Sequence, residues 1–299
     1  MTTRDIAMKR MESQKIAVGR LATPTDVVAW LGAVQAQDPI MAPWAVGARC
    51  AKPSMAAVTA AVDDGSLIRI HALRPTWHLV ASADLRWIIA LSAPRIRASM
   101  RGRQRVLGID AAVLAKNRRL LEKALRDGNH LTRDEVRARY LEAGFGADDN
   151  RISHLLMGAE LDGLICSGRT SRGRPTYALL DERVPDGLSL PRDEAIARLA
   201  RTYFRSRAPS TPEDFAWWSG LTLGDARRAV EMIGGDFARE TISEITYVVP
   251  RDGGAARRGK SDGGGVYFLP SYDEILISYA DRSAVLAAVD EKRTVSENG

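Results

Sequence analysis

The chain has 299 residues, which is enough for two or more domains with hydrophobic cores of their own. Its hydrophobic share of 45%, charged share of 27% and net charge of +6 are those of an ordinary soluble protein that can bind an anionic partner. The two cysteines are far apart, and neither a signal peptide nor a membrane-length apolar run is present, so we expect no disulfide framework, no zinc site and a cytoplasmic location.

The first segment, residues 1–108, carries the least regular pattern. Three helices are expected in its first half, near residues 13–22, 24–36 and 54–64. Two alternating strands around a turn at Arg74-Pro75 follow in the run S-L-I-R-I-H-A-L-R-P-T-W-H-L-V-A. Residues 82–106 then begin as a helix and continue as the basic run P-R-I-R-A-S-M-R-G-R-Q-R-V.

Two neutral amides stand in the run A-V-Q-A-Q-D-P, residues 33–39. Gln35 and Gln37 follow the apolar stretch V-V-A-W-L-G, which is typical of the buried face of a helix. One interpretation is that the glutamines, which are good helix formers, cap a helix before Pro39. The other is that they hold a water molecule or a base in a pocket.

The central segment, residues 109–185, has the clearest pattern. Helices are expected over residues 110–127, 132–141 and 149–163. Asp110 and Gly128 can cap the two ends of the first helix, and Thr132 with Glu135 forms a capping box for the second. Two strand-like runs, L-I-C-S-G and T-Y-A-L-L, follow and are joined by the basic run R-T-S-R-G-R-P. This order predicts a winged helix whose third helix reads DNA and whose hairpin is the wing.

The same order recurs in residues 186–250. A helix over 192–206 precedes a helix with Thr211 as N-cap and Pro212 at its first position. The runs T-L-G-D-A-R-R-A-V-E-M-I-G, F-A-R-E-T-I and T-Y-V-V-P then give a third helix and two strands.

The pattern predicts a mainly α fold with small β-hairpins, built as three tandem winged-helix units with a truncated β-rich C-terminal segment. The predicted boundaries are 1–108, 109–185 and 186–250 for the three units, and 251–299 for a basic Gly-rich loop with a partial C-terminal β domain.

Arginines form two clusters in this framework. No acidic residue lies between Asp84 and Asp110, so the arginines between them must face water or an external anion. The wing is also basic. Each cluster alone fits a solvated face equally well, but together with winged helices they favour a nucleic acid that releases counterions on binding. The predicted DNA-binding residues are Arg95, Arg97, Arg101, Arg103, Arg105, Arg151, Arg169, Arg172 and Arg174.

Familiar cofactor and metal motifs are absent from the sequence. It contains no phosphate-binding loop, no dinucleotide fingerprint and no H-E-x-x-H, and its four histidines lack metal-ligand spacing. His71 and His78 flank the predicted turn and could approach each other, although a satisfied surface or core histidine is the commoner case. Trp77, Trp217 and Trp218 are more typical of core residues than of base-stacking platforms. We therefore expect no metal and no cofactor.

Four motifs, in order, carry a resemblance to a known family. They are V-Q-A-Q-D-P, R-P-T-W-H-L-V-A, W-W-S-G-L-T-L-G-D-A-R-R-A and F-L-P-S-Y-D-E-I-L-I-S-Y-A-D-R-S. Over nearly its whole length the chain resembles the AlkZ-like DNA glycosylases. The resemblance implies three winged helices and a C-terminal β-barrel around duplex DNA, and excision of alkylated purines that includes unhooking of interstrand crosslinks.

The family's Gln-apolar-Gln motif matches Gln35-Ala36-Gln37 position by position, in the branch that has Gln rather than Asp at the last position. The resemblance therefore implies that Gln35 and Gln37 are the catalytic residues. The sequence departs from the family at its end, where V-S-E-N-G stands in place of a further β-rich tract. From this we expect unpaired strand edges near F-L-P-S-Y-D-E-I-L-I-S-Y.

The chemistry of such lesions suits neutral amides. A purine alkylated at N7 or N3 is cationic, so its glycosidic bond is already labile and breaks through an oxocarbenium-like sugar. An amide can orient a water molecule and direct its carbonyl dipole at the developing charge. We expect Gln37 to position the water and Gln35 to assist. Asp38 could act as a base, but capping the turn before Pro39 is its preferred role.

Two function classes stay open at this point. The first is a monofunctional, monomeric DNA glycosylase that acts on double-stranded DNA with alkylated bases, in the cytoplasm at the nucleoid. The second is a non-catalytic winged-helix DNA-binding protein such as a transcriptional regulator, which has no need of the glutamine pair. A protein-interaction scaffold is a third class, but it leaves the arginine clusters unexplained.

Overall fold

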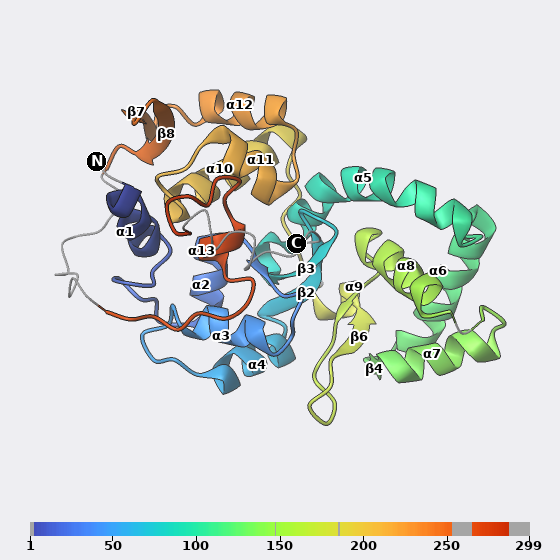
Figure 1. Cartoon of the computed structure of the whole chain (residues 1–299). Helices are drawn as coiled ribbons and strands as arrows, with labels where there is room; N and C mark the ends of the chain where they lie inside the picture. The colour runs from blue at the N-terminus through green and yellow to red at the C-terminus, as the bar shows by residue number, and fades with distance from the viewer. Residues whose placement is uncertain (1–2, 147, 185, 253–264, 287–299) are drawn as a thin grey trace. The chain divides into compact units, whose positions relative to one another are not determined.

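The computed structural model describes residues 3–146, 148–184, 186–252 and 265–286 (Figure 1). The chain divides into two compact units. Unit 1 combines Met1–Met55 with Pro191–Gly299, and unit 2 is Ala56–Leu190. This division by contacts passes through the predicted 1–108 segment, and the four-segment organisation stays a prediction. Within the described ranges, no helix is both long and apolar enough to cross a membrane.

Unit 2 contains the central pattern predicted from the sequence. Its helices here are α6 (Ala111–Leu125), α7 (Arg133–Glu142) and α8 (Asp149–Leu161), and its strands are β4 (Leu131–Thr132), β5 (Ile165–Ser167) and β6 (Thr176–Leu179). The strands form one antiparallel sheet in the order β4-β6-β5. Helix, strand, two helices and a strand pair is the connectivity of a winged helix. The three helices and the two strand runs predicted here are confirmed, with small shifts at their ends.

The N-terminal caps predicted for these helices are confirmed by their hydrogen bonds, whereas the predicted end cap Gly128 is wrong, because α6 ends at Leu125 with Arg126 as its C-cap. The Asp110 carboxylate accepts from the N–H of Val113 at 2.8 Å. Thr132 and Glu135 form the reciprocal capping box at the start of α7. Such bonds satisfy N–H groups that a helix leaves without partners at its first turn. The local sequence therefore determines where these helices begin.

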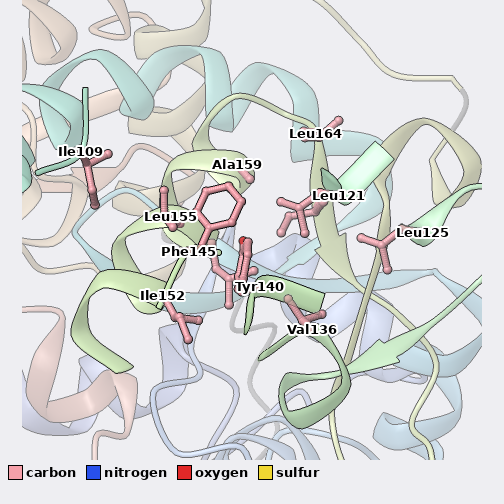
Figure 2. Packing of buried hydrophobic residues seen from close by; sticks show 12 residues of the cluster. Ile109, Leu121, Leu125, Val136, Tyr140, Phe145, Ile152, Leu155, Ala159 and Leu164 are labelled. Carbon is pink, nitrogen blue, oxygen red and sulfur yellow. The ribbon is translucent and has the colours of Figure 1, made fainter. Parts of the chain in front are cut away.

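Aliphatic and aromatic side chains from α6, α7 and α8 form the core beneath this sheet (Figure 2). Tyr140 and Phe145 lie side by side, with their ring centroids 5.1 Å apart. The Tyr140 hydroxyl donates to Oδ1 of Asn117 at 2.7 Å, and Asn117 Nδ2 donates to the Leu155 carbonyl at 3.1 Å. Burial raises the pKa of Tyr140 well above its usual value, which keeps the hydroxyl a donor. The polar pair is thus satisfied inside an apolar core.

Removal of this hydroxyl tests the buried polar pair. Tyr140→Phe is expected to lower the free energy of unfolding by about 1–2 kcal/mol, because Oδ1 of Asn117 is left without a donor in the core. Urea denaturation measures the change. The control is Tyr272→Phe, whose ring is exposed and whose variant we expect to differ from the parent by under about 0.5 kcal/mol. Equal stability of the Tyr140 variant and the parent would contradict this description of the core.

The rest of unit 2 is a hairpin with flanking helices. These elements are α4 (Met55–Asp64), β2 (Leu67–Ala72), β3 (Thr76–Ala81), α5 (Ser82–Val106) and α9 (Leu180–Arg183). The predicted hairpin is confirmed, and β2 pairs with β3 in an antiparallel register that sets Ile70 opposite His78. The expected alternation is wrong, because nearly every residue of β2 is buried. α5 and α8 both pack against β2, which accounts for part of this burial.

α5 corrects a second expectation. It runs unbroken for 25 residues and includes Pro94, so the basic run after the proline is helical. A proline inside a helix removes one main-chain hydrogen bond. The exposed arginines of residues 95–105 therefore project from the same continuous helix that begins at Ser82.

Unit 1 contains elements from both ends of the chain. The N-terminal ones are α1 (Thr3–Ser13), α2 (Pro24–Leu31), β1 (Val34–Gln35) and α3 (Met41–Gly47). The C-terminal ones are α10 (Arg192–Ser206), α11 (Pro212–Ser219), α12 (Leu223–Met232), β7 (Phe237–Ile242), β8 (Ile245–Pro250) and α13 (Glu274–Ile277). The predicted helix 192–206, the Thr211 cap with Pro212 and the final strand pair are all confirmed. An isolated bridge joins Ser210 to Val248, so the helices and strands after Pro191 follow the same order as those of unit 2.

Two N-terminal helix predictions are wrong in their bounds. The helix expected near 13–22 ends at Ser13, since Lys15 and Gly19 adopt positive φ angles of 62° and 66°. The helix expected over 24–36 ends at Leu31, because Gly32 turns the chain with φ 77°. The buried face predicted for it is confirmed in Val27, Val28 and Leu31.

The C-terminal expectation of unpaired strand edges is wrong for the part that the structure describes. The run expected to be strand-like contains the helical turn α13, which begins where the Asp273 carboxylate accepts from the Ile275 N–H at 2.9 Å. Asp273, Glu274 and Ser278 are fully buried, so this segment is part of the core of unit 1. Most of the predicted Gly-rich loop, residues 253–264, lies outside the described residues.

Candidate active site

The glutamine segment lies in unit 1, directly after α2. A capping box of Thr23 and Asp26 begins that helix, and Gly32 ends it. The chain is then buried from Ala33 to Ala36, with Gln35 only 7% exposed, while Gln37 is exposed. Val34 and Gln35 form the short strand β1, so the interpretation that the glutamines cap a helix is wrong. The segment thus presents one buried and one exposed amide.

Asp38 has the role that was preferred for it. Its carboxylate accepts from the N–H groups of Ile40 at 2.8 Å and Met41 at 3.1 Å, and its carbonyl accepts from Ala42 at 3.1 Å. These bonds begin α3 and fix the turn that follows Gln37. The Asp38 carboxylate therefore has a capping role, because it binds main-chain N–H groups of the turn.

The main chain around the glutamines is held by two fully buried side chains. The Arg207 guanidinium donates to the carbonyls of Leu31 at 2.7 Å and Ala33 at 3.3 Å. Oε1 of Glu274 accepts from the main-chain N–H of Gln35 at 2.8 Å. Both side chains are 0% exposed, and they form an ion pair at 2.7 Å. Three main-chain groups between α2 and β1 are therefore fixed by one arginine–glutamate pair.

The remaining partners of Glu274 converge on its other oxygen. Oε2 accepts from Nη2 of Arg207, from the Ser278 hydroxyl at 2.6 Å and from Nε1 of Trp218 at 3.0 Å. The Trp218 ring also lies under the Arg207 guanidinium, 4.3 Å from its centroid. Burial alone would raise the pKa of Glu274, but the Arg207 charge and these hydrogen bonds lower it to about 2. The carboxylate is therefore ionised at neutral pH.

A second buried pair lies beside the first. Asp273 binds Arg49 through both oxygens, at 2.7 and 2.9 Å. Arg49 also donates to both oxygens of Gln14, the main-chain one at 3.0 Å and the side-chain one at 2.8 Å. Burial lowers and Asp273 raises the pKa of Arg49, with a net rise. This pair joins the N-terminal residues to the start of α13.

Sequence reasoning missed the roles of Arg207, Asp273 and Glu274. In the sequence analysis, the run Y-D-E at residues 272–274 was used only as part of the fourth family motif. Glu274 is 239 positions from Gln35 and 67 from Arg207, so no local spacing relates them. The available signal was the presence of two adjacent acids, Asp273 and Glu274, in an otherwise apolar run.

The nine arginines predicted to bind DNA lie in unit 2 and fall into two groups. Three are engaged with protein groups. Arg97 binds Asp162 and the Leu161 carbonyl, Arg151 donates to the carbonyls of Leu107 and Phe145, and Arg174 pairs with Asp134 at 2.8 Å. The others are exposed and have no hydrogen bond or ion pair from their side chains to any residue that the structure describes. They are Arg95, Arg101, Arg103, Arg105, Arg169 and Arg172.

Two of these arginines allow a matched comparison one helical turn apart on α5. Arg101→Gln is expected to weaken binding to duplex DNA and to lower the slope of log affinity against log salt by about 0.9, the value for one phosphate contact. Arg97→Gln should leave the slope nearly unchanged, because Asp162 already neutralises that guanidinium. Fluorescence anisotropy over a salt series measures both. Equal slopes for the two variants would contradict the division of the arginines into two groups.

The predicted approach of His71 and His78 does not lead to a metal site. The His71 ring hydrogen-bonds to the buried Glu160 carboxylate and lies 4.1 Å from the Trp77 ring, while Nδ1 of His78 meets the Thr76 carbonyl at 3.0 Å. Trp77 and Glu160 line a pocket of about 250 Å³ in unit 2. No cluster of three or more His, Cys, Asp or Glu residues able to hold a metal was found in the described part of the chain.

Helices with small antiparallel sheets make this a mixed fold of a kind already known among DNA-repair enzymes. The solved structure of the Streptomyces sahachiroi DNA glycosylase AlkZ superposes with a TM-score of 0.79 at 23% identity, covering 100% of this chain and 83% of that one. An interstrand DNA cross-link repair glycosylase from Streptomyces sahachiroi is 24% identical over an alignment of 317 positions, which covers 98% of this chain and 81% of the relative.

The family model for the AlkZ-like DNA glycosylases matches residues 28–299, a range that includes both glutamines and Glu274. The chain belongs to this family of DNA glycosylases. The resemblance noted from its four sequence motifs is thereby confirmed.

Proposed function

We propose that this protein is a monofunctional DNA-repair glycosylase that hydrolyses the N-glycosidic bond of purines alkylated at N7 or N3 in duplex DNA. Family membership supports the reaction class. The observation that carries the assignment of the site is the exposed Gln37 at the end of a buried segment whose main chain is fixed by Arg207 and Glu274. A rigid backbone beneath an exposed amide is what water positioning requires.

In this proposal the lesion supplies most of the driving force. The cationic base is a good leaving group, and the sugar gains positive charge as the bond lengthens. The Gln37 carbonyl accepts a hydrogen bond from the attacking water and directs its dipole towards the sugar, and Gln35 assists from the buried side. Two neutral amides have little power over normal nucleosides, so the enzyme favours bases that are already activated. No metal ion and no cofactor takes part.

The surrounding architecture follows from the same proposal. We place three winged-helix units along the chain. The element orders after Pro191 and in unit 2 support two of them. The exposed arginines of α5 and of the segment between β5 and β6 bind the phosphates of double-stranded DNA, and the protein acts as a monomer at the nucleoid in the cytoplasm. Because the curated relative is named for cross-link repair, we include unhooking of N7-linked interstrand crosslinks among its activities.

A duplex with a single N7-methylguanine tests the proposed reaction. Incubation with the protein should create abasic sites, seen as strand scission after mild heat, and no scission should occur without heat. A second duplex with an N7–N7 crosslink should separate into single strands on a denaturing gel. If no alkylated duplex acquires abasic sites while binding persists, the non-catalytic DNA-binding alternative is correct.

A further inference from the structure

We propose that Glu274, held by Arg207, is a positioning residue that sets the backbone of the catalytic glutamine segment. This inference rests on the proposed function of Gln35 and Gln37. Glu274 touches neither substrate nor water in this role. It acts through the main-chain N–H of Gln35, which donates to Oε1 at 2.8 Å.

The Arg207–Glu274 pair satisfies several main-chain groups of the segment that precedes Gln37. Leu31 ends α2, so its carbonyl has no helical partner, and Ala33 lies between that helix and β1. Buried main-chain groups without partners are costly. Arg207 binds both carbonyls and Glu274 binds the N–H of Gln35. The pair therefore fixes the main chain at every second residue from the end of α2 to the first catalytic glutamine.

A buried ion pair often adds little net stability, because both charges lose their hydration. Apolar side chains of similar volume could fill the space of the pair, but they could not bind two carbonyls and an N–H. Both side chains of the pair are 0% exposed. We therefore infer that the main effect of the pair is to fix the main-chain conformation of residues 31–35, and that its net contribution to the free energy of unfolding is secondary.

Glu274 differs from its neighbour Asp273 in the groups that its carboxylate binds. Asp273 is equally buried, begins the same helical turn and is also paired with a buried arginine, Arg49. Its bonds lead to Arg49 and to Ile275, whereas those of Glu274 lead to Gln35. Adjacent in sequence and alike in charge and burial, the two residues form a natural test and control.

The test compares Glu274→Gln with Asp273→Asn in the full-length chain. An amide has one acceptor oxygen, so Gln at 274 cannot accept from all of Arg207, Ser278, Trp218 and the Gln35 N–H. We expect the single-turnover rate constant for N7-methylguanine excision to fall about 10- to 100-fold in Glu274→Gln, because small misplacements of a catalytic group have effects of that order. DNA affinity should be unchanged. Asp273→Asn should lose stability to urea but keep its rate constant within about threefold of the parent.

A second readout does not depend on activity. Hydrogen exchange at the Gln35 main-chain amide should be at least about 10-fold faster in Glu274→Gln and unchanged in Asp273→Asn. If the parent excises nothing, the proposed function fails, while the exchange result still decides whether Glu274 holds the segment. Equal losses of rate in both variants, or unchanged exchange at Gln35, would overturn the inference.

Ser278→Ala provides the test if Glu274→Gln does not fold. It removes one donor to Glu274 and one acceptor from Arg207 but keeps the ion pair. A rate loss of about 3- to 10-fold with faster exchange at Gln35 supports the positioning role. A parent-like rate and parent-like exchange refute it.

Discussion

Replacement of Gln37 by alanine is expected to lower the single-turnover rate constant for N7-methylguanine excision by about 100-fold or more, with DNA affinity unchanged. Loss of one preorganised dipole directed at a developing charge has effects of this size in other enzymes. Gln37 is exposed, so the truncation leaves no cavity in the core, and the fold should persist. The rate is measured with enzyme in excess over a duplex with one lesion.

Two controls separate catalysis from binding. Asp38→Asn changes the adjacent residue, whose carboxylate caps α3, and should keep the rate constant within about threefold of the parent. A loss as large as that of Gln37→Ala would instead identify Asp38 as a general base. Gln104→Ala removes an amide from α5, in the other unit, and should excise like the parent. Parent-like excision by Gln37→Ala would show that the water is positioned by another group.

The second large effect concerns stability. Arg207→Met is expected to lower the free energy of unfolding at pH 7 by about 3–5 kcal/mol, because it leaves the buried Glu274 carboxylate without its counter-charge. The same change at Arg228, whose pair with Asp193 is exposed, should cost less than about 1 kcal/mol. Urea denaturation of both variants provides the comparison. Similar losses would mean that Arg207 contributes no more than a surface residue.

The difference in stability between the parent and Arg207→Met should depend on pH. The pKa of Glu274 falls from 4.5 to about 2 on folding, so its stabilising contribution is complete above pH 4.5 and is lost as the pH falls towards 2. Arg207→Met lacks that contribution at every pH. The stability gap between the parent and this variant should therefore narrow when the denaturation is repeated at pH 3. A gap that widens in acid would contradict the charged pairing.

The local sequence was sufficient for many elements of the fold. Asp110, Thr132 with Glu135, and Thr211 with Pro212 predict helix starts that the hydrogen bonds confirm, since a cap and its first turn are neighbours in the chain. The helix expected over 24–36 was extended past Gly32, although a glycine at that place is a common helix end, whereas the positive φ angle of Lys15 has no signal in the residue type.

Charges that pair across distant elements were less predictable. The arginines of α5 have no acid near them in sequence, yet Arg97 is neutralised by Asp162 at the end of α8. Likewise, the run with Asp273 and Glu274 was expected to be strand-like, and it is a helical turn because both acids pair with buried arginines of other elements. Such partners are set by the tertiary fold, which no single stretch of residues encodes.

The candidate site was predictable only in part for the same reason. The glutamine pair was identified through a family motif that spans three residues, Gln35 to Gln37. The Arg207–Glu274 pair that holds this motif is assembled from residues far apart in the chain, so its role is visible only in the structure.

The central claim is that the glutamine segment hydrolyses a damaged nucleoside with water alone. Mass spectrometry of the reaction in water enriched with oxygen-18 tests it most directly, with the N7-methylguanine duplex as substrate. The account predicts free 7-methylguanine and an intact strand whose abasic sugar contains one oxygen-18 atom, in amounts that fall with Gln37→Ala. Release of no free base, or cleavage of the strand in the same step that releases the base, would contradict it.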